Sequence, residues 1–201
     1  MAHKANDSIG VGDNVGATVQ RNLEAGIKLK GYLSGVITRA DGTKEVVADR
    51  EPNLITTQGF EFIARNLYET LGLGSGDLNT NNRAIYVGLS NNQSNTVAGD
   101  RSMTKLEGEF GTGSGFMDIR RKVVESSDYS AVTVDGTTTR KQILKASFTA
   151  SQDRENIHKS GLYTDLTGNT LIHIADFNAN FSIGQNDSVE VTWEITVDES
   201  A

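Results

Sequence analysis

Residues 188–197 read Ser-Val-Glu-Val-Thr-Trp-Glu-Ile-Thr-Val, an alternation of apolar and polar side chains along the whole stretch. Successive side chains of an extended chain point to opposite faces. One face therefore carries Val189, Val191, Trp193, Ile195 and Val197, and the other carries Glu190, Thr192, Glu194 and Thr196. The pattern predicts a half-buried β-strand with a β-branched and aromatic face in a core and a solvated face of Thr and Glu.

Similar strand patterns recur along the chain, separated by turns rich in Gly, Asn and Asp. Alternation begins at Ile27, and Asp41-Gly42 is a hairpin signal before the next run at 44–48. We expect further strands at 84–89, 119–125, 131–134, 142–150, 157–164 and 171–177, with turns at 135–136 and 184–187. This spacing is typical of an antiparallel β-sandwich or jelly-roll-like domain, which we expect over residues 27–201.

One segment has a helical period. Between residues 57 and 71 the apolar positions are spaced by three and four, which predicts an amphipathic helix. Thr56 or Thr57 is suited to cap its start and Gly72 its end. We expect its apolar face to cover the sheet, through Phe60, Ile63, Ala64, Leu67 and Leu71. The predicted fold class is all-β with one helix.

The composition narrows the classes of function. The chain has 201 residues, a net charge of −7 and no cysteine, so disulfides, thiolate metal sites and thiol nucleophiles are excluded. Its acidic balance argues against a nucleic-acid partner. It contains no apolar run of the roughly 18 residues that a membrane span needs, and no apolar core of a signal peptide. We expect synthesis in the cytoplasm without secretion, and neither a membrane nor a nucleic-acid partner.

Several candidate sites fail on their residue pattern. Asp77-Leu-Asn79-Thr-Asn81 opens like a calcium loop, but Asn82 and Gly88 stand where a glycine and a bidentate Glu are needed. Solvated loop is the better interpretation, and a divalent ion near Asp77 is the alternative. Glu107 and Glu109 lack the aromatic-rich setting of a glycosidase.

The remaining chemical candidates also carry a simpler structural interpretation. The three histidines, His3, His158 and His173, lack metal-ligand spacing. The basic run Arg120-Arg121-Lys122 fits a solvated strand face better than a phosphate groove, and Trp193, the only tryptophan, fits a core. We therefore predict no catalytic residue, no metal site, no cofactor and no enzymatic activity.

Residues 1–26 form a separate segment, an extended N-terminal arm. Glycines are frequent in it, and its apolar anchors are Ile9, Val11, Val15, Val19 and Leu23. Such a segment buries too little apolar surface to fold alone. We expect it to dock either on its own domain or on a neighbouring subunit, with these five residues as contacts. Residues 90–118 form a long polar connection, which is usually functional or ordered by a partner.

The order of these features resembles a group of small virion structural proteins of tailed bacteriophages. The resemblance rests on residues 21–26, Asp41-Gly42, the segment 51–59 that reads Glu-Pro-Asn-Leu-Ile-Thr-Thr-Gln-Gly, Ile85–Leu89, Gly161-Leu162-Tyr163 and Asp187 before the last strand. It spans nearly the whole chain. It implies a β-sandwich that assembles on the outside of a particle without catalysis, and it assigns no active-site residue.

Three functional hypotheses follow. The first is a capsid decoration or cement protein, a homo-oligomer such as a trimer, whose arm clamps neighbouring subunits next to major capsid proteins. The second is a tail or head-to-tail appendage component, such as a fibre base, in contact with tail proteins. The third is a carbohydrate-binding module. The residues leave open the choice between capsid and tail, the host, the oligomer symmetry, and whether residues 90–118 bind a receptor.

Overall fold

The structure, a computed structural model, describes residues 27–70, 85–111, 121–134 and 137–199. These residues are mostly in β-strands, as predicted. The elements are β1 (Ile27–Thr38), β2 (Lys44–Pro52), β3 (Leu54–Ile55), α2 (Thr57–Thr70), β4 (Tyr86–Ser90), the 3₁₀-helix η2 (Ala98–Ser102), β5 (Arg121–Val123), β6 (Ser126–Val134), β7 (Thr137–Thr149), β8 (Arg154–Tyr163), β9 (Leu171–Ile183) and β10 (Ser188–Glu199).

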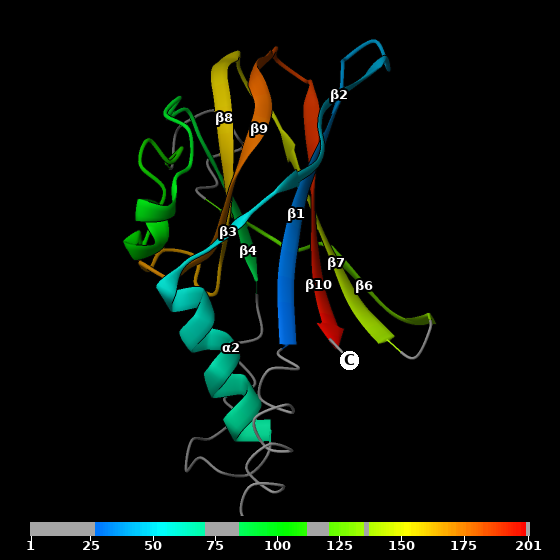
Figure 1. The fold of residues 1–201 in the computed structure, drawn as a ribbon. Helices are drawn as coiled ribbons and strands as arrows, with labels where there is room; N and C mark the ends of the chain where they lie inside the picture. The colour runs from blue at the N-terminus through cyan, green and yellow to red at the C-terminus, as the bar shows by residue number, and fades with distance from the viewer. Residues whose placement is uncertain (1–26, 71–84, 112–120, 135–136, 200–201) are drawn as a thin grey trace, which may run out of the picture.

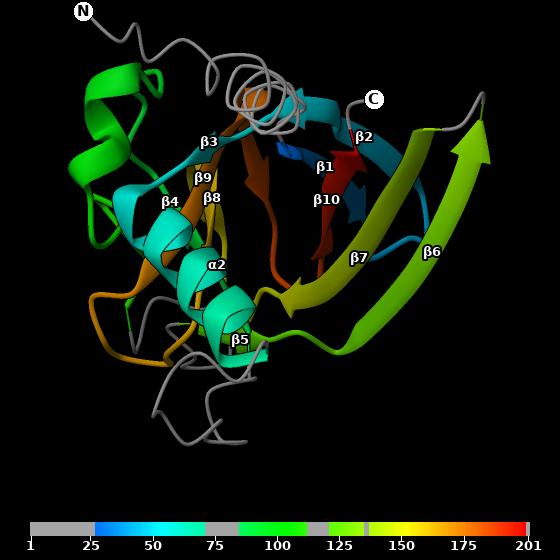
Figure 2. The ribbon, with the colours of Figure 1, turned by 60° about the horizontal axis from the view of Figure 1, so that its bottom comes forward.

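The strands form two five-stranded antiparallel sheets that pack against each other (Figure 1). Sheet A has the order β2-β1-β10-β7-β6, and sheet B has the order β3-β9-β8-β4-β5. The predicted all-β sandwich is therefore confirmed. Figure 2 shows α2 beside sheet B and the β6–β7 hairpin curving away at the other side of the molecule.

The last strand, β10, lies in the middle of sheet A between β1 and β7. In this register Trp193 stands between Leu33 and Leu144, and all three side chains belong to the main core. Trp193 is fully buried, and its Nε1 donates a 3.3 Å hydrogen bond to Ser160 Oγ on β8. The predicted apolar face is confirmed at Val189, Val191 and Trp193. One strand thus joins both sheets.

The alternation weakens toward the end of β10. Ile195 and Val197 are only half-buried, whereas Thr196, predicted on the wet face, is buried. Lys30 and Lys141 stand on either side of Thr196 in the register. Lys30 forms an ion pair with Asp198 and Lys141 one with Glu194, so charged side chains with long apolar stems flank the threonine.

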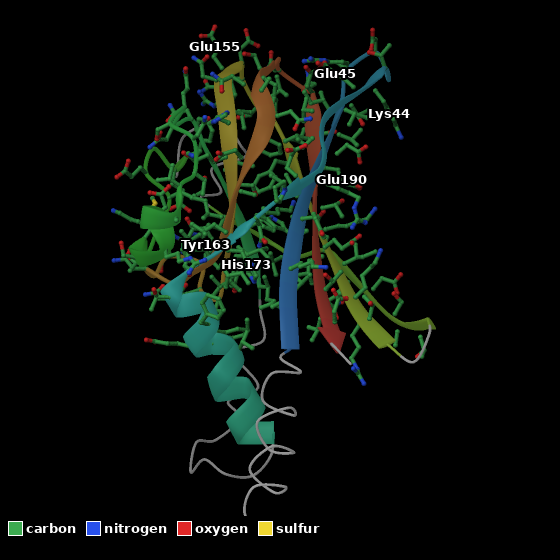
Figure 3. All side chains as sticks on the ribbon, viewed as in Figure 1. Lys44, Glu45, Glu155, Tyr163, His173 and Glu190 are labelled. Atoms are coloured by element: carbon green, nitrogen blue, oxygen red, sulfur yellow. The ribbon has the colours of Figure 1, made fainter. Side chains whose placement is uncertain are left out.

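The outer face of sheet A is polar, as the sequence predicts, but its charges are paired across strands. Glu194 contacts Arg50 on β2 at 2.8 Å and Lys141 on β7 at 3.0 Å, and its side chain is only 13% exposed. Glu190, which Figure 3 labels, pairs with Lys145 at 3.1 Å and remains largely exposed. The two predicted wet-face glutamates therefore lie in different environments.

Helix α2 begins as predicted, with Thr56 Oγ1 accepting a 3.0 Å hydrogen bond from the backbone N–H of Gly59. Of its predicted apolar face, Ile63 is half-buried but Phe60 is exposed, and the side chains of Ala64, Leu67 and Leu71 lie outside the described part of the chain. A Cβ atom at Gly59 would collide with the carbonyl oxygen of Ile172 in β9, so the helix approaches the sheet at this glycine. Phe62 and Ile63 follow at helical spacing and are half-buried, with Phe62 against the core, which leaves Phe60 49% exposed.

Several strands are longer than the sequence predicts. β6 begins at Ser126 and not at 131, β7 begins at Thr137 and not at 142, and β9 continues to Ile183 past the expected end at 177. In β6 and β9 the polar segments Ser126–Ser130 and Asn178–Asn180 hide the strand pattern. The side chains that the structure describes in these two segments face water, so the usual apolar half of the alternation is missing.

Changing Trp193 to Ala should destabilise the fold by about 3–5 kcal/mol, because it empties the largest side-chain volume in the core. Equilibrium denaturation in urea measures the effect. Glu190→Gln, on the exposed face of the same strand, is the control and should shift stability by no more than about 0.5 kcal/mol. Equal midpoints for the two variants would contradict the assignment of Trp193 to the core.

Candidate functional site

The long connection after β4 packs on the outer face of sheet B. Leu106 lies with Tyr163, Leu171 and Ile174 in a second, smaller core on that face. Backbone contacts hold the segment in place: Phe110 N–H donates to the Leu89 carbonyl at 2.9 Å, and Ser90 pairs with Glu109 in an isolated bridge. Residues 91–111 are therefore a covering layer of the sandwich, anchored by Leu106 and these backbone contacts, although most of their side chains are exposed. The expected connection continues to 118, outside the described residues.

Arg121 on β5 is the most enclosed charge in the described part of the chain, with no exposed surface. Its Nε and Nη2 donate to the two carboxylate oxygens of Glu109 at 2.6 and 3.1 Å. Its Nη1 donates to the backbone carbonyls of Asp165 and Gly168 at 2.8 and 2.7 Å. The guanidinium also lies over the Tyr163 ring, with Cζ 3.4 Å from the centroid.

This arrangement corrects the predicted role of the basic run 120–122. Arg121 does not lie on a solvated face: four hydrogen bonds and a ring contact hold it inside the protein. Burial raises the pKa of the neighbouring Tyr163 hydroxyl, which accepts a hydrogen bond from the Leu106 N–H. The cluster therefore joins β5, the 91–111 segment and the loop after β8 into one unit.

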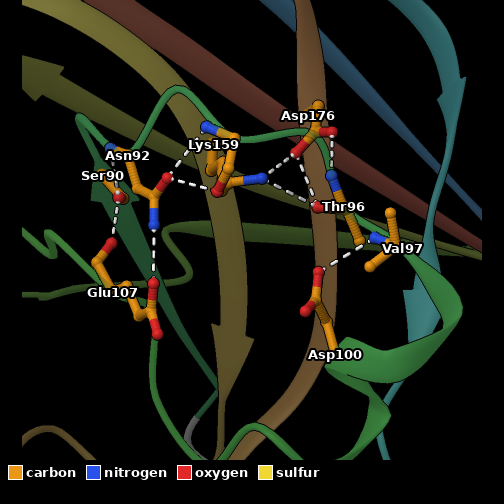
Figure 4. A network of polar contacts seen from close by, with 9 residues as sticks. Ser90, Asn92, Thr96, Val97, Asp100, Glu107, Lys159 and Asp176 are labelled. Carbon is orange, nitrogen blue, oxygen red and sulfur yellow. Dashed lines mark hydrogen bonds and ion pairs between the residues drawn. The ribbon is translucent and has the colours of Figure 1, made fainter.

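A second buried cation, Lys159 on β8, belongs to the network shown in Figure 4. Its Nζ lies 2.7 Å from Asp176 Oδ1 on β9 and 3.1 Å from Thr96 Oγ1. Asp176 also accepts bonds from the Thr96 N–H and hydroxyl, each at 2.6 Å. These bonds and the ammonium group lower the pKa of the Asp176 carboxyl, although its burial opposes the shift.

Beside this network lies a groove of about 460 Å³. Pro52 and Leu54 line one wall, Asp176 and Asn178 line the other, and Val97, which is 59% exposed, stands at its rim. The only carboxylate of the network that reaches the groove, Asp176, is already bound by Lys159 and Thr96. The groove is thus a mixed polar and apolar surface beside a neutralised acid.

The two described histidines are buried, and neither lies in a cluster of metal ligands. Burial lowers the pKa of His173 to about 4, so it is neutral near pH 7, and its Nδ1 lies 2.5 Å from Asn53 Nδ2. Its ring packs 6.1 Å from that of Trp193 (Figure 3 shows its position). The pKa of His158 is also lowered by burial. Among the described residues no three His, Cys, Asp or Glu side chains are grouped to hold a metal ion.

The structure separates the carboxylates that the sequence places together. Glu107 Oε2 accepts a bond from Asn92 at 2.9 Å on the surface, whereas Glu109 is turned inward to Arg121. Asp165 accepts bonds from the N–H groups of Thr167 and Gly168 in its own loop, which lowers the pKa of its carboxyl. Each carboxylate thus has a local structural role.

The predicted arm contacts Ile9, Val11, Val15, Val19 and Leu23 lie outside the described residues, as does the loop from Asp77 to Asn81. The sequence interpretation missed that the charged side chains of Arg121, Glu109 and Lys159 are enclosed in the protein. The sequence does contain one relevant pattern: Arg121 comes twelve residues after Glu109 and just before the apolar end of its strand. Without the fold, however, this pattern cannot be distinguished from an ion pair on the surface.

No family model matches the chain, and no curated protein sequence matches it. Within the described residues, no helix has the length and apolar character needed to cross a membrane.

Arg121→Met should destabilise the fold by about 3–5 kcal/mol, because it leaves the Glu109 carboxylate, 4% exposed, without its countercharge. Thermal and urea unfolding measure this loss, and adding Glu109→Gln should recover part of it. Lys122→Met is the control, since Lys122 forms a partly exposed pair with Glu125 and should change stability by less than about 1 kcal/mol. Similar losses at the two positions would show that Arg121 is not the buried centre of the cluster.

Proposed function

We propose that the chain is a non-enzymatic structural protein of a tailed-bacteriophage virion, a capsid decoration or cement protein whose N-terminal arm, residues 1–26, clamps neighbouring subunits. The observation that carries the proposal is that the buried charged side chains bind other groups of the protein itself. Arg121 directs four hydrogen bonds to protein groups, and Lys159 is bound by Asp176 and Thr96. These groups stabilise a scaffold, and the resemblance described above is to proteins that serve as scaffolds on a particle.

The charge pattern of the surface also supports a role in assembly. The outer face of sheet A carries acids and bases in cross-strand pairs, such as Glu194 with Arg50 and Lys141. Paired charges of both signs keep a domain soluble at high local concentration without a strong field of one sign. Such a domain suits repeated, closely spaced placement on a shell, as a homo-oligomer beside major capsid proteins.

A tail or head-to-tail appendage is the second candidate. The groove beside Asp176 favours it, because an appendage that meets a receptor or a larger fibre needs an open binding surface. The carbohydrate-binding hypothesis loses its main support, since Trp193 is fully buried and offers no platform for a sugar ring.

Quantitative mass spectrometry of purified particles of the phage that encodes the chain tests the proposal. A shell protein should be present in hundreds of copies, in proportion to the major capsid protein. Six copies or a small multiple of six would place the chain in the tail and favour the second candidate. Its absence from washed particles would overturn a virion role.

Removal of residues 1–26 should leave the thermal transition of the remaining domain in place, because residues 27–199 already supply two core clusters and the arm has too little apolar surface to fold alone. The truncated chain should fail to join particles when it competes with the full chain during infection. A variant with Glu155→Gln, an exposed change near the start of β8, should be incorporated normally. Loss of the thermal transition in the truncated chain would assign the arm to its own domain.

A further inference from the structure

The edge strand β6 differs from the other edges of the sandwich. It pairs with β7 along its full length from Ser126 to Val134, and no described strand pairs with its other side. Its exposed positions include neighbouring residues, Ser127 with Asp128 and Ser130 with Ala131, so both faces of the strand meet water there. It carries one charge, Asp128, and neither proline nor lysine.

The other described edges carry recognised protection against strand addition. β2 contains Lys44, Glu45, Asp49, Arg50, Glu51 and Pro52, and its pairing with β1 is broken by register shifts. β3 and β5 have two and three residues. Charges, proline, irregular register and short length are the usual devices that block an edge. Apart from the single charge of Asp128, β6 has none of the first three, and the strand has nine residues.

The hairpin connection shows which backbone groups point outward. Val134 pairs with Thr137 across two residues, and a two-residue connection closes on a pair that exchanges both hydrogen bonds. Alternate pairs of an antiparallel ladder are bonded in this way. The even-numbered residues of β6 therefore bond to β7, while Tyr129 and Ala131 direct their N–H and C=O groups to the outer edge.

The N-terminal arm has the sequence of a strand. Its five apolar anchors, Ile9, Val11, Val15, Val19 and Leu23, all have odd numbers, so they share one face of an extended chain. Three glycines, Gly10, Gly12 and Gly16, fall on the opposite face. Between residues 9 and 19 the only charge is Asp13. Residues 9–19 can therefore lie along the nine residues of β6 without placing runs of like charge opposite one another.

We propose that residues 9–19 of one copy of the chain add as an antiparallel strand to the β6 edge of a second copy. This inference rests on the proposed clamp function and identifies the surface that receives the arm. Backbone hydrogen bonds from Tyr129 and Ala131 supply the contact, and the alternating anchors set its register. Because donor and acceptor surfaces differ, the contact is head-to-tail and closes into a ring only at a suitable rotation.

The geometry of sheet A favours exchange between copies. Ile27 pairs with Glu199, at the same end of the sheet as the β6–β7 turn. A strand added antiparallel to the chain's own β6 would place residue 19 beside Ser126, roughly 30 Å from Ile27 by strand spacing and rise. The eight steps from residue 19 to 27 span at most about 28 Å when fully extended. Addition to its own edge in this register would stretch the connection completely, whereas addition to a second copy leaves the connection free.

Cysteine cross-linking of the full-length chain tests this inference, since the chain has no cysteine of its own. Purified chains carrying Val15→Cys are mixed with chains carrying Ala131→Cys and oxidised, and Val11→Cys and Val19→Cys are tested in parallel to find the register. We expect a disulfide-linked heterodimer from at least one arm position. Val46→Cys, on the exposed and charge-protected edge strand β2, replaces Ala131→Cys as the control and should give no heterodimer.

A second arm of the experiment tests the backbone contact. Ala131→Pro removes an outward N–H without breaking the ladder to β7. In the cysteine-free chain this change should reduce self-association, measured by sedimentation, at least fivefold. Ala131→Thr is the control and should not reduce it. Equal cross-linking to positions 46 and 131 would overturn the inference. Disulfide homodimers of the Ala131→Cys chain alone, which indicate β6–β6 pairing, would also overturn it. So would a disulfide that forms only within one chain when a single chain carries both Val15→Cys and Ala131→Cys. The copy number in particles is measured in a separate experiment. The proposed function and this inference can therefore each fail without the other.

Discussion

The register of β10 is the constraint on which the rest of the structure depends. The strand lies between β1 and β7, and its inward side chains supply the centre of the core, with Trp193 hydrogen-bonded to Ser160 in the opposite sheet. A shift by one residue would turn Trp193 to water and Glu194 into the core, because side chains alternate with a period of two. The outer ion pairs of Glu194 and Asp198 form only in the same register. Core packing and surface charge therefore select one alignment.

Sheet B depends on a different kind of interaction. Its outer face is closed by the 91–111 segment, which buries few apolar side chains, and much of the attachment is polar. Arg121, Glu109, Lys159 and Asp176 fix this layer at two points, on β5 and on β8–β9. Removing one partner of such a buried pair leaves the other charge buried without compensation, so these contacts form only when the layer is in place. The layer consequently has a defined position even though its sequence resembles a loop.

The sequence predicts the class of fold because strand alternation and turn residues are local signals. The terminal strand, the hairpin at Asp41-Gly42 and the helix start at Thr56 are all set by nearby residues, and the structure has each of them. The errors arise where distant contacts decide. Phe60 is exposed because Gly59 meets β9, Thr196 is buried between lysines of two other strands, and Arg121 is enclosed by residues far along the chain. The arm contacts remain a prediction, since residues 1–26 lie outside the described part of the chain.

The pairing of β1 with β10 also sets the order of events during folding. These strands lie side by side in the middle of sheet A, yet the ion pair that joins Lys30 to Asp198 spans 168 positions of the sequence. Closing so large a loop costs conformational entropy before any contact is gained, and folds dominated by such distant pairings form slowly. Sheet A cannot close before residues 188–199 have left the ribosome. Until then β1 and β7 lack their shared neighbour, and a chaperone that shields exposed strands would act in that interval.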